Sequence, residues 1–276
     1  MTSPILVTGG TGTLGRFVVR RLLGAGYDVR VLSRRSHDSE EGLEFMIGDL
    51  ATGEGIEAAV DGIETIVHLA GSTKGDEDKA RNLVRAASGV GAQHLVYISV
   101  VGADRIPVVS RVDRVMFGYF ESKRAAERIV ADSGLPWTTL RATQFHDLTL
   151  TVAQQMAKLP VIPVPAGFRF QPVDTDEVAA RLVELTLGDP ASLVPDIAGP
   201  RVYGMNELVC GYLRATRWRR LIVPVWLPGK AARVFRAGAN LALERAVGHR
   251  TSEEFLADQV RDRKVTPDRT AGVQSG

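Results

Sequence analysis

Two residues four positions apart, Tyr119 and Lys123, form the pair in this chain whose types and spacing most directly suggest catalysis. The pattern of residues 118–133 predicts a helix, and residues four apart lie on the same face of a helix. A lysine ammonium close to a phenol favours the phenolate, so we expect Lys123 to lower a pKa that is near ~10 in a free tyrosine. Tyr119 could then act as a general acid or base toward a carbonyl or an alcohol. Tyr-x-x-x-Lys is common by chance, so its weight depends on where the sequence places it.

A glycine-rich turn near the start of the chain predicts a dinucleotide site. Gly10, Gly12 and Gly15 fit the fingerprint G-x-G-x-x-G, and Gly9 adds the variant G-x-x-G-x-x-G. Glycine permits a chain reversal with positive φ, close approach of a pyrophosphate, and tight packing of helix on strand. The N-terminus of the following helix offers free N–H groups to the phosphates. An ordinary tight turn is the alternative, but the position between an apolar strand at residues 4–8 and an apolar-periodic helix favours the dinucleotide.

The end of the second predicted strand indicates which dinucleotide is preferred. An acidic residue there would bind the ribose 2′-hydroxyl of NAD, but the chain has Ser33-Arg34-Arg35. Two guanidiniums and a hydroxyl suit a 2′-phosphate, so we expect NADP(H) to be preferred over NAD(H). A solvated loop is the alternative reading of the two arginines. Asp49 could reach the adenine amino group, or could act as a turn or helix cap. The full set of expected cofactor contacts is Gly9, Thr11, Gly12, Thr13, Leu14, Gly15, Ser33, Arg34, Arg35, Asp49, Leu50, Ala70, Gly71 and Lys123.

The elements that must position these residues alternate between strand and helix. Apolar segments near residues 4–8, 28–33, 43–47, 63–69, 94–98 and 137–140 are separated by helical patterns. Such strands, apolar on both faces, predict a doubly wound parallel α/β sheet whose ligands bind beyond the carboxyl ends of the strands. We expect a dinucleotide-binding core over residues 1–150 and a smaller lobe over 151–261 that completes the sheet and covers the substrate cleft. Residues 262–276 read as a flexible tail.

Within the later part of the chain the pattern is less regular. Residues 101–118 read as a long connection, the prolines at 160–165 mark loops, and residues 168–173 resemble a strand. Helices are predicted over 174–185, 203–213 and 229–247, and a short strand over 221–225.

Candidate residues on the substrate side follow the fifth and sixth predicted strands. Ser99 would lie near the nicotinamide, although a simple strand-end hydroxyl is an equal alternative. Gln144, Phe145 and His146 lie in a segment that should line the substrate site, with a polar loop residue as the alternative for His146. His68 and His94 fall on strands and read as core or edge histidines. No spacing of His, Asp and Glu predicts a metal site.

Bulk composition is that of an ordinary globular protein. The chain has 276 residues, a formal net charge of +2 and one cysteine, Cys210, so a reducing cytoplasm is expected and an internal disulfide is excluded. No secretory leader or apolar run of ~20 residues is visible. Residues 211–250 contain nine Lys or Arg and one acid, Glu244, with Trp218, Trp226 and Phe235 interleaved. An anionic-lipid or nucleic-acid surface is conceivable, but a solvated face is favoured, and no nucleic-acid partner is expected.

These motifs together resemble the short-chain dehydrogenase/reductase superfamily, and more narrowly its atypical NmrA-like NAD(P)H-binding branch. The resemblance rests on Thr8–Gly15, the basic end of the second strand, Gly48-Asp49-Leu50 and Tyr119-x-x-x-Lys123, together with residues 140–145 and 172–179. It implies a Rossmann fold, bound NADP(H) and, in many members, reduction of quinones, imines or other small molecules. Some members of the branch sense the redox state of the cofactor without turnover. One departure is Val101, which would take the position of the superfamily's catalytic serine if the chain aligns as in the sugar-epimerase branch.

The sequence therefore predicts an NADP(H)-dependent oxidoreductase of a small apolar carbonyl, quinone or imine. Tyr119 would be the proton donor, Lys123 its partner and ribose anchor, and Ser99 a further catalytic candidate. The alternatives are a cofactor-binding redox regulator of a partner protein and, with less support, a nucleotide-sugar epimerase. Substrate identity and oligomeric state are not encoded in any recognisable pattern.

Overall fold

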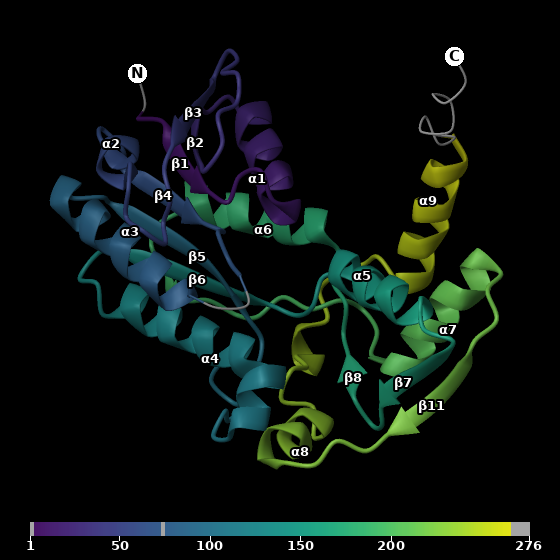
Figure 1. The fold of residues 1–276 in the computed structure, drawn as a ribbon. Coiled ribbons are helices and arrows are strands. Elements are labelled where there is room, and N and C mark those ends of the chain that lie inside the picture. The colour runs from purple at the N-terminus through teal and green to yellow at the C-terminus, as the bar shows by residue number, and fades with distance from the viewer. Residues whose placement is uncertain (1–2, 73–74, 266–276) are drawn as a thin grey trace, which may run out of the picture.

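The computed structural model describes residues 3–72 and 75–265, and its central element is a seven-stranded parallel sheet (Figure 1). The strand order is β3-β2-β1-β4-β5-β6-β9, and every neighbouring pair is parallel. The strands of this sheet are β1 (Ile5–Thr8), β2 (Val29–Ser33), β3 (Leu43–Ile47), β4 (Thr65–His68), β5 (His94–Val100), β6 (Trp137–Ala142) and β9 (Ser192–Leu193).

Helices cover both faces of this sheet. On one face α1 (Thr13–Gly24) packs against α6 (Thr175–Leu187) over a core of aliphatic side chains. On the other face lie α2 (Ile56–Val60), α3 (Asp76–Val90) and α4 (Arg111–Ala131), over a second core. Because both faces are covered, every residue of the interior strand β5 is buried. The predicted doubly wound α/β fold is confirmed.

The order of the strands fixes where a ligand can bind. From β1 the chain passes to β2 and β3 on one side, and it then returns to add β4, β5 and β6 on the other side. The carboxyl ends of β1 and β4 therefore border the crevice where the strand order reverses, which is where open α/β sheets bind ligands.

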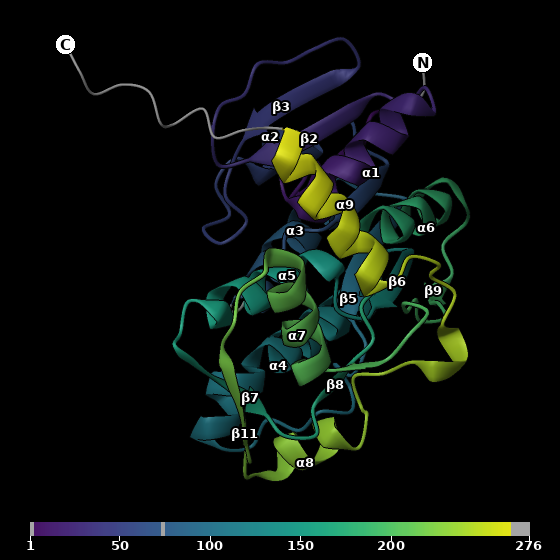
Figure 2. The ribbon, with the colours of Figure 1, turned by 90° about the vertical axis from the view of Figure 1, so that its right-hand side faces the viewer.

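Most of the chain after β6, apart from α6 and β9, forms a smaller lobe beside the sheet. Its helices α5 (His146–Ala157), α7 (Met205–Thr216) and α9 (Ser252–Val265) pack together, as Figure 2 shows. The lobe also contains a parallel strand pair, β7 (Val161–Pro165) with β11 (Leu221–Val225), and an antiparallel pair, β8 (Arg169–Phe170) with β10 (Tyr203–Gly204). Finally, α8 (Lys230–Arg236) packs against α4.

Several boundaries differ from the sequence prediction. The helix expected at 118–133 begins at Arg111, because Ser110 and Asp113 form a capping box at its start. The helix expected over 229–247 ends at Arg236, followed by Gly238 at φ +94° and a short 3₁₀ turn at Leu243–Arg245. The proline-rich stretch at 160–165, predicted as loop, contains β7. Helix α9 extends to Val265, and the rest of the predicted tail lies outside the described residues.

Candidate functional site

The glycine turn lies between β1 and α1, as the sequence predicts. Gly9 has φ +73°, and a Cβ on it would lie 2.8 Å from the backbone nitrogen of Ala70 at the end of β4. A Cβ on Gly15 would overlap the carbonyl oxygen of Gly9. Helix α1 has no side-chain N-cap and no acidic residue in its first turn, so its first N–H groups are open to an anion.

A cleft of about 670 Å³ runs from this turn to the C-terminal lobe. Its sheet end is lined by Gly9, Gly12, Thr13, Leu14 and Gly15. The polar groups Ser99, Tyr119, Lys123 and Gln144 lie along it. Its far end is almost entirely apolar and is lined by Met116, Phe117, Phe120, Phe145, Leu148, Phe168, Phe170, Met205 and Phe235.

Two buried polar atoms in this cleft have no hydrogen-bond partner within the described part of the chain. They are the hydroxyl oxygen of Ser99 and the side-chain oxygen of Gln144. A buried polar group without a partner costs free energy, so a bound molecule that hydrogen-bonds there is favoured. Together with the glycine cradle, which a Cβ would fill, these groups fit a bound dinucleotide.

Lys123 is buried in a polar cluster at the side of the cleft. Its ammonium lies 3.2 Å from Asp76 Oδ2 and donates a hydrogen bond to the carbonyl oxygen of Ile98 at 3.3 Å. Lys79 lies 3.4 Å from the other oxygen of Asp76. Burial lowers the pKa of Lys123, and the carboxylate of Asp76 opposes that shift. A Cβ on Gly71 would come within 2.9 Å of the ammonium, so glycine at this position leaves room for Lys123.

The expected effect of Lys123 on Tyr119 is wrong. Burial, and after it the negative charge of Asp76, raises the pKa of Tyr119 well above its ordinary value. The ammonium lies 5.8 Å from the centre of the Tyr119 ring and is paired with Asp76, so it does not stabilise the phenolate. Tyr119 lines the cleft as an un-ionised phenol, which is a proton donor and not a base.

No pattern in the sequence indicates the groups that surround Lys123. The ammonium lies 5.1 Å from the ring centre of Tyr97, whose buried hydroxyl has no partner among the described residues. His68 stacks on Tyr97 and shares a 2.7 Å hydrogen bond with Thr8. Burial, and then the charge of Lys123, lowers the pKa of His68 to about 3, so the ring is neutral. Tyr97 and His68 lie on adjacent strands, and only their shared register brings them together.

The residues predicted to bind a 2′-phosphate lie at the end of β2. The side chains of Arg34 and Arg35 are exposed, and neither has a partner within residues 3–72 and 75–265. Ser33 is nearly buried and accepts a hydrogen bond from the Arg35 backbone N–H at 3.2 Å. Asp49 accepts a bond from the Ala51 N–H at 2.9 Å, so the turn role left open by the sequence is present. The side chain of Leu50 packs in the core.

Three other predicted residues lie at the edges of the cleft or away from it. Thr11 is exposed at the tip of the glycine turn. Val101 is fully buried, and its N–H donates to the carbonyl of Ala142, so no hydroxyl replaces the missing serine there. The backbone of Ala70 packs directly against Gly9.

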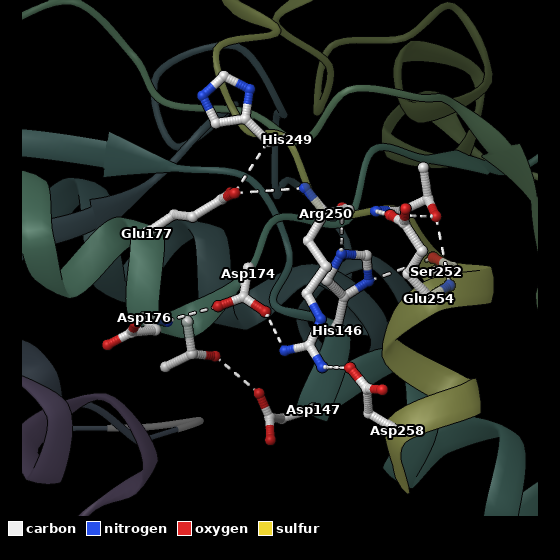
Figure 3. A network of polar contacts seen from close by, with 12 residues as sticks. His146, Asp147, Asp174, Asp176, Glu177, His249, Arg250, Ser252, Glu254 and Asp258 are labelled. Atoms are coloured by element: carbon white, nitrogen blue, oxygen red, sulfur yellow. Dashed lines mark hydrogen bonds and ion pairs between the residues drawn. The ribbon is translucent and has the colours of Figure 1, made fainter. Parts of the chain in front are cut away.

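His146 does not line the cleft, which differs from the expectation that it contacts substrate. Its ring is buried and stacks on Phe255 with 5.1 Å between ring centres. Its Nε2 donates to the carbonyl of Arg250 at 3.0 Å, and its Nδ1 lies 3.2 Å from the Ser252 hydroxyl (Figure 3). Burial is the main cause that lowers the pKa of His146. The histidine therefore fastens α9 to the start of α5.

Arg250 extends this fastening, as Figure 3 shows. Its guanidinium donates to Asp174 at 2.7 Å and to Asp258 at 2.6 Å, which joins the start of α6 to α9. Asp174 also accepts from the Asp176 N–H, the N-cap that the sequence predicts for α6. This network is structural and lies apart from the cleft residues.

Within the described residues no group of three or more His, Cys, Asp or Glu side chains could hold a metal ion. Across the same residues, none of the helices combines the length and the apolar character that crossing a bilayer requires.

Comparison with known proteins adds the family. A family model described as NAD(P)H-binding matches residues 9–198, which is more than half of the chain. The chain belongs to this NAD(P)H-binding family. This membership confirms the NAD(P)H-binding part of the predicted resemblance. The NmrA-like branch remains a prediction.

The individual relatives share only limited sequence identity with this chain. The chain is 32% identical over 199 residues to a ceramide reductase of Caulobacter vibrioides, covering 65% of this chain and 59% of that protein. It is 25% identical over 251 residues to the photosystem II assembly factor Ycf39 of Trieres chinensis, covering 84% of this chain and 75% of that protein. The chain thus spans less than two thirds of the reductase.

Among solved structures, an NADPH-dependent quinone oxidoreductase of Escherichia coli, complexed with NADPH, superposes with a TM-score of 0.75. The sequence identity is 18%, over 92% of this chain and 99% of that one. At this identity the likeness confirms the fold, and the chemistry has to be argued from the residues.

Proposed function

We propose that this NAD(P)H-binding protein is a reductase that transfers a hydride from NADPH to an apolar carbonyl, quinone or imine. The observation that carries the proposal is the single cleft that joins the glycine turn, Ser99 and Tyr119 to an apolar chamber. Family membership supports hydride chemistry in general, and relatives that carry reductase names agree with it.

The residues of the chain would have the following roles. The amides at the start of α1 and the glycine turn bind the pyrophosphate, and Lys123 holds the nicotinamide ribose. The bound cofactor would supply the hydride, either to the carbon of the C=O or C=N bond of a carbonyl or imine, or to the conjugated ring system of a quinone. Tyr119 donates its phenolic proton to the oxygen or nitrogen, so that the product is an alcohol, a hydroquinone or an amine. A phenol whose pKa is raised stays protonated at neutral pH, so it holds the proton that the reductive direction requires, although it is a weaker acid than a free tyrosine.

The lining of the cleft supports an apolar substrate. Phe117, Phe120, Phe168 and Phe235 form one aromatic cluster, with stacked rings 4.7 Å apart at Phe168 and Phe235. Such a surface favours flat or aliphatic molecules and offers few donors or acceptors for sugar hydroxyls. This is the reason for ranking an epimerase of nucleotide-sugars below a reductase.

The preference for NADP(H) over NAD(H) is part of the proposal. Arg34 and Arg35 are exposed and free of other partners within the described residues, so both guanidiniums are available to a 2′-phosphate.

The test is NADPH oxidation by the purified full chain against panels of quinones, aldehydes and imines. Tyr119→Phe is expected to lower kcat by about 100-fold while leaving the Kd of NADPH unchanged, because only proton donation is lost. Tyr27→Phe, at a tyrosine outside the cleft, is the matched control and is expected to keep full activity. If no panel member is reduced, or if Tyr119→Phe keeps wild-type kcat, the assignment is wrong.

A second candidate is a redox-dependent regulator of a partner protein. It is favoured by the Asp76–Lys123 pair, which occupies the lysine in a role other than phenolate stabilisation, and by the likeness to an assembly factor. A regulator must bind NADP⁺ and NADPH with different affinity and transmit that difference to a partner. Equal capture of partner proteins in the two cofactor states would exclude it.

A further inference from the structure

The strand pair β7–β11 exposes one face that is apolar throughout. In the parallel register Leu221 lies beside Val161, and Val223 lies beside Pro163. Leu221 is 63% exposed and Val223 is 39% exposed, whereas Ile162 and Val164 on the other face are buried against the lobe helices. Strands with this alternation have one face packed and one face turned to solvent, and the outer face is normally polar.

Tryptophans flank this face at both ends of β11. Trp218 precedes the strand and is 46% exposed, and Trp226 follows it and is 67% exposed. An arginine lies over each indole. The guanidinium carbon of Arg220 is 5.0 Å from the ring centre of Trp218, and that of Arg236 is 3.9 Å from the ring centre of Trp226. In Figure 1 β11 runs along the outer margin of the lobe, and the exposure of its side chains shows that nothing in the described chain covers the patch. We call it the β7–β11 face.

The charges on the segments that build the β7–β11 face are all of one sign. The two segments that build it, residues 148–173 and 208–243, contain no aspartate or glutamate. Over the same segments there are nine cations: Lys158, Arg169, Arg214, Arg217, Arg219, Arg220, Lys230, Arg233 and Arg236. The chain as a whole carries a net charge of only +2, so this concentration of positive charge is local.

The β7–β11 pair is a poor site for the addition of a strand from a protein partner. A partner strand needs a row of backbone N–H donors, and proline supplies none. Pro163 and Pro165 interrupt β7, and Pro224 interrupts β11. The β7–β11 face therefore offers apolar surface and positive charge but no regular ladder of hydrogen bonds.

We propose that the β7–β11 face docks on a membrane surface that contains anionic lipids. Exposed aliphatic side chains would enter the boundary between headgroups and acyl chains, and the two tryptophans would lie at the depth that indoles prefer. The surrounding cations would pair with anionic headgroups. The sequence favoured a solvated face for this segment, and the reason for revising that reading is the apolar side-chain row, which only the strand pairing reveals. The proposal is independent of the reductase assignment.

Flotation of the full chain with lipid vesicles tests this docking. The wild-type chain is expected to bind vesicles of phosphatidylcholine mixed with phosphatidylglycerol, and to bind vesicles of phosphatidylcholine alone at least about tenfold more weakly. Leu221→Thr with Val223→Thr keeps β propensity, removes the apolar surface, and is expected to weaken binding by about tenfold. Arg219→Glu is expected to weaken it by about tenfold as well, and more at low salt than at high salt.

The matched control is Leu187→Thr with Leu193→Thr, two exposed leucines on α6 and β9 that lie on the sheet domain. It is expected to bind vesicles as the wild type does. Equal binding to neutral and anionic vesicles, or wild-type binding by the Leu221/Val223 variant, would overturn the proposal. So would a dimer in sedimentation that the same variant dissociates, because a second copy would then cover the face. Tighter binding to a single-stranded oligonucleotide than to the anionic vesicles would overturn it too.

Discussion

Replacing Asp76 with asparagine tests the buried ion pair beside the cleft. The side chains of Asp76 and Lys123 are only 1% and 5% exposed, and their charged atoms lie 3.2 Å apart. Asparagine keeps the shape of the side chain and can still accept the 2.8 Å hydrogen bond from the Ser72 N–H. The substitution therefore removes the charge and leaves Lys123 buried without its carboxylate.

The expected loss of stability is about 3 kcal/mol. At 3.2 Å and an effective dielectric constant of ~20, Coulomb attraction between unit charges is ~5 kcal/mol. Removing one partner of a buried pair costs ~3–5 kcal/mol because the other charge stays desolvated. We take the lower end because Lys123 can release its proton, which burial already favours. In a chain of this size ~3 kcal/mol corresponds to a fall in Tm of about 6 °C.

Urea denaturation followed by tryptophan fluorescence measures this loss. Asp78→Asn is the matched control: it lies in the same first turn of α3, is 68% exposed and is 3.8 Å from Arg81, so its loss should stay below ~0.5 kcal/mol. The double variant Asp76→Asn with Lys123→Met should recover much of the stability, because no unpaired charge remains.

The pH dependence provides a second measurement. Without Asp76 the folded-state pKa of Lys123 falls further below its unfolded value near ~10.4, so the unfolded state binds more protons across that window. The deficit of Asp76→Asn should therefore shrink as the pH rises toward ~10. If Asp76→Asn is no less stable than Asp78→Asn, or if its deficit grows with pH, the pair does not carry the energy assigned to it.

Two further predictions concern the cofactor and the core histidine. Arg34→Ala with Arg35→Ala should weaken NADPH binding by about 10- to 100-fold and change NADH binding little, measured by calorimetry, since charge-assisted bonds to a 2′-phosphate are lost. Arg124→Ala, an exposed arginine on α4, is the control, and equal losses for NADPH and NADH would contradict the role. For His68, the folded-state pKa of about 3 lies below the unfolded value near ~6.5. The contribution of the neutral ring to folding stability is therefore complete above pH ~6.5 and is lost as the pH falls toward 3. The wild type should lose about 2 kcal/mol from this group between pH 7 and pH 5, and His68→Gln should lose that much less in urea titrations. An identical acid slope in the two proteins would show that His68 takes up no proton on unfolding.

The glycine turn between β1 and α1 could be predicted because its signals are local. The turn from Gly9 to Gly15 requires glycine for reasons that operate within a few residues, and Gly9 at φ +73° satisfies them. The fold class could be predicted in the same way, because strands such as β5 are apolar at most positions, which is typical of a strand buried on both faces. The cap of α6 at Asp174 is equally local.

The boundaries that were wrong reflect competing local signals. Ser110 and Asp113 form a capping box that the sequence displays, yet residues 101–118 read as a long connection. In β7 the prolines suggested a loop, but a two-stranded pair has free edges, where a missing N–H costs little.

The sequence by itself determined the sheet, the glycine turn and the position of Tyr119 and Lys123 on one helix. Only the tertiary structure decided the surroundings of those two residues, because Asp76, Tyr97 and His68 reach Lys123 from other elements of the sheet domain. The same holds for His146, which packs against Phe255, more than 100 positions along the chain, instead of entering the cleft. A motif depends on spacing within one element, whereas burial and charge depend on what the fold places around it, and these set the pKa of Tyr119.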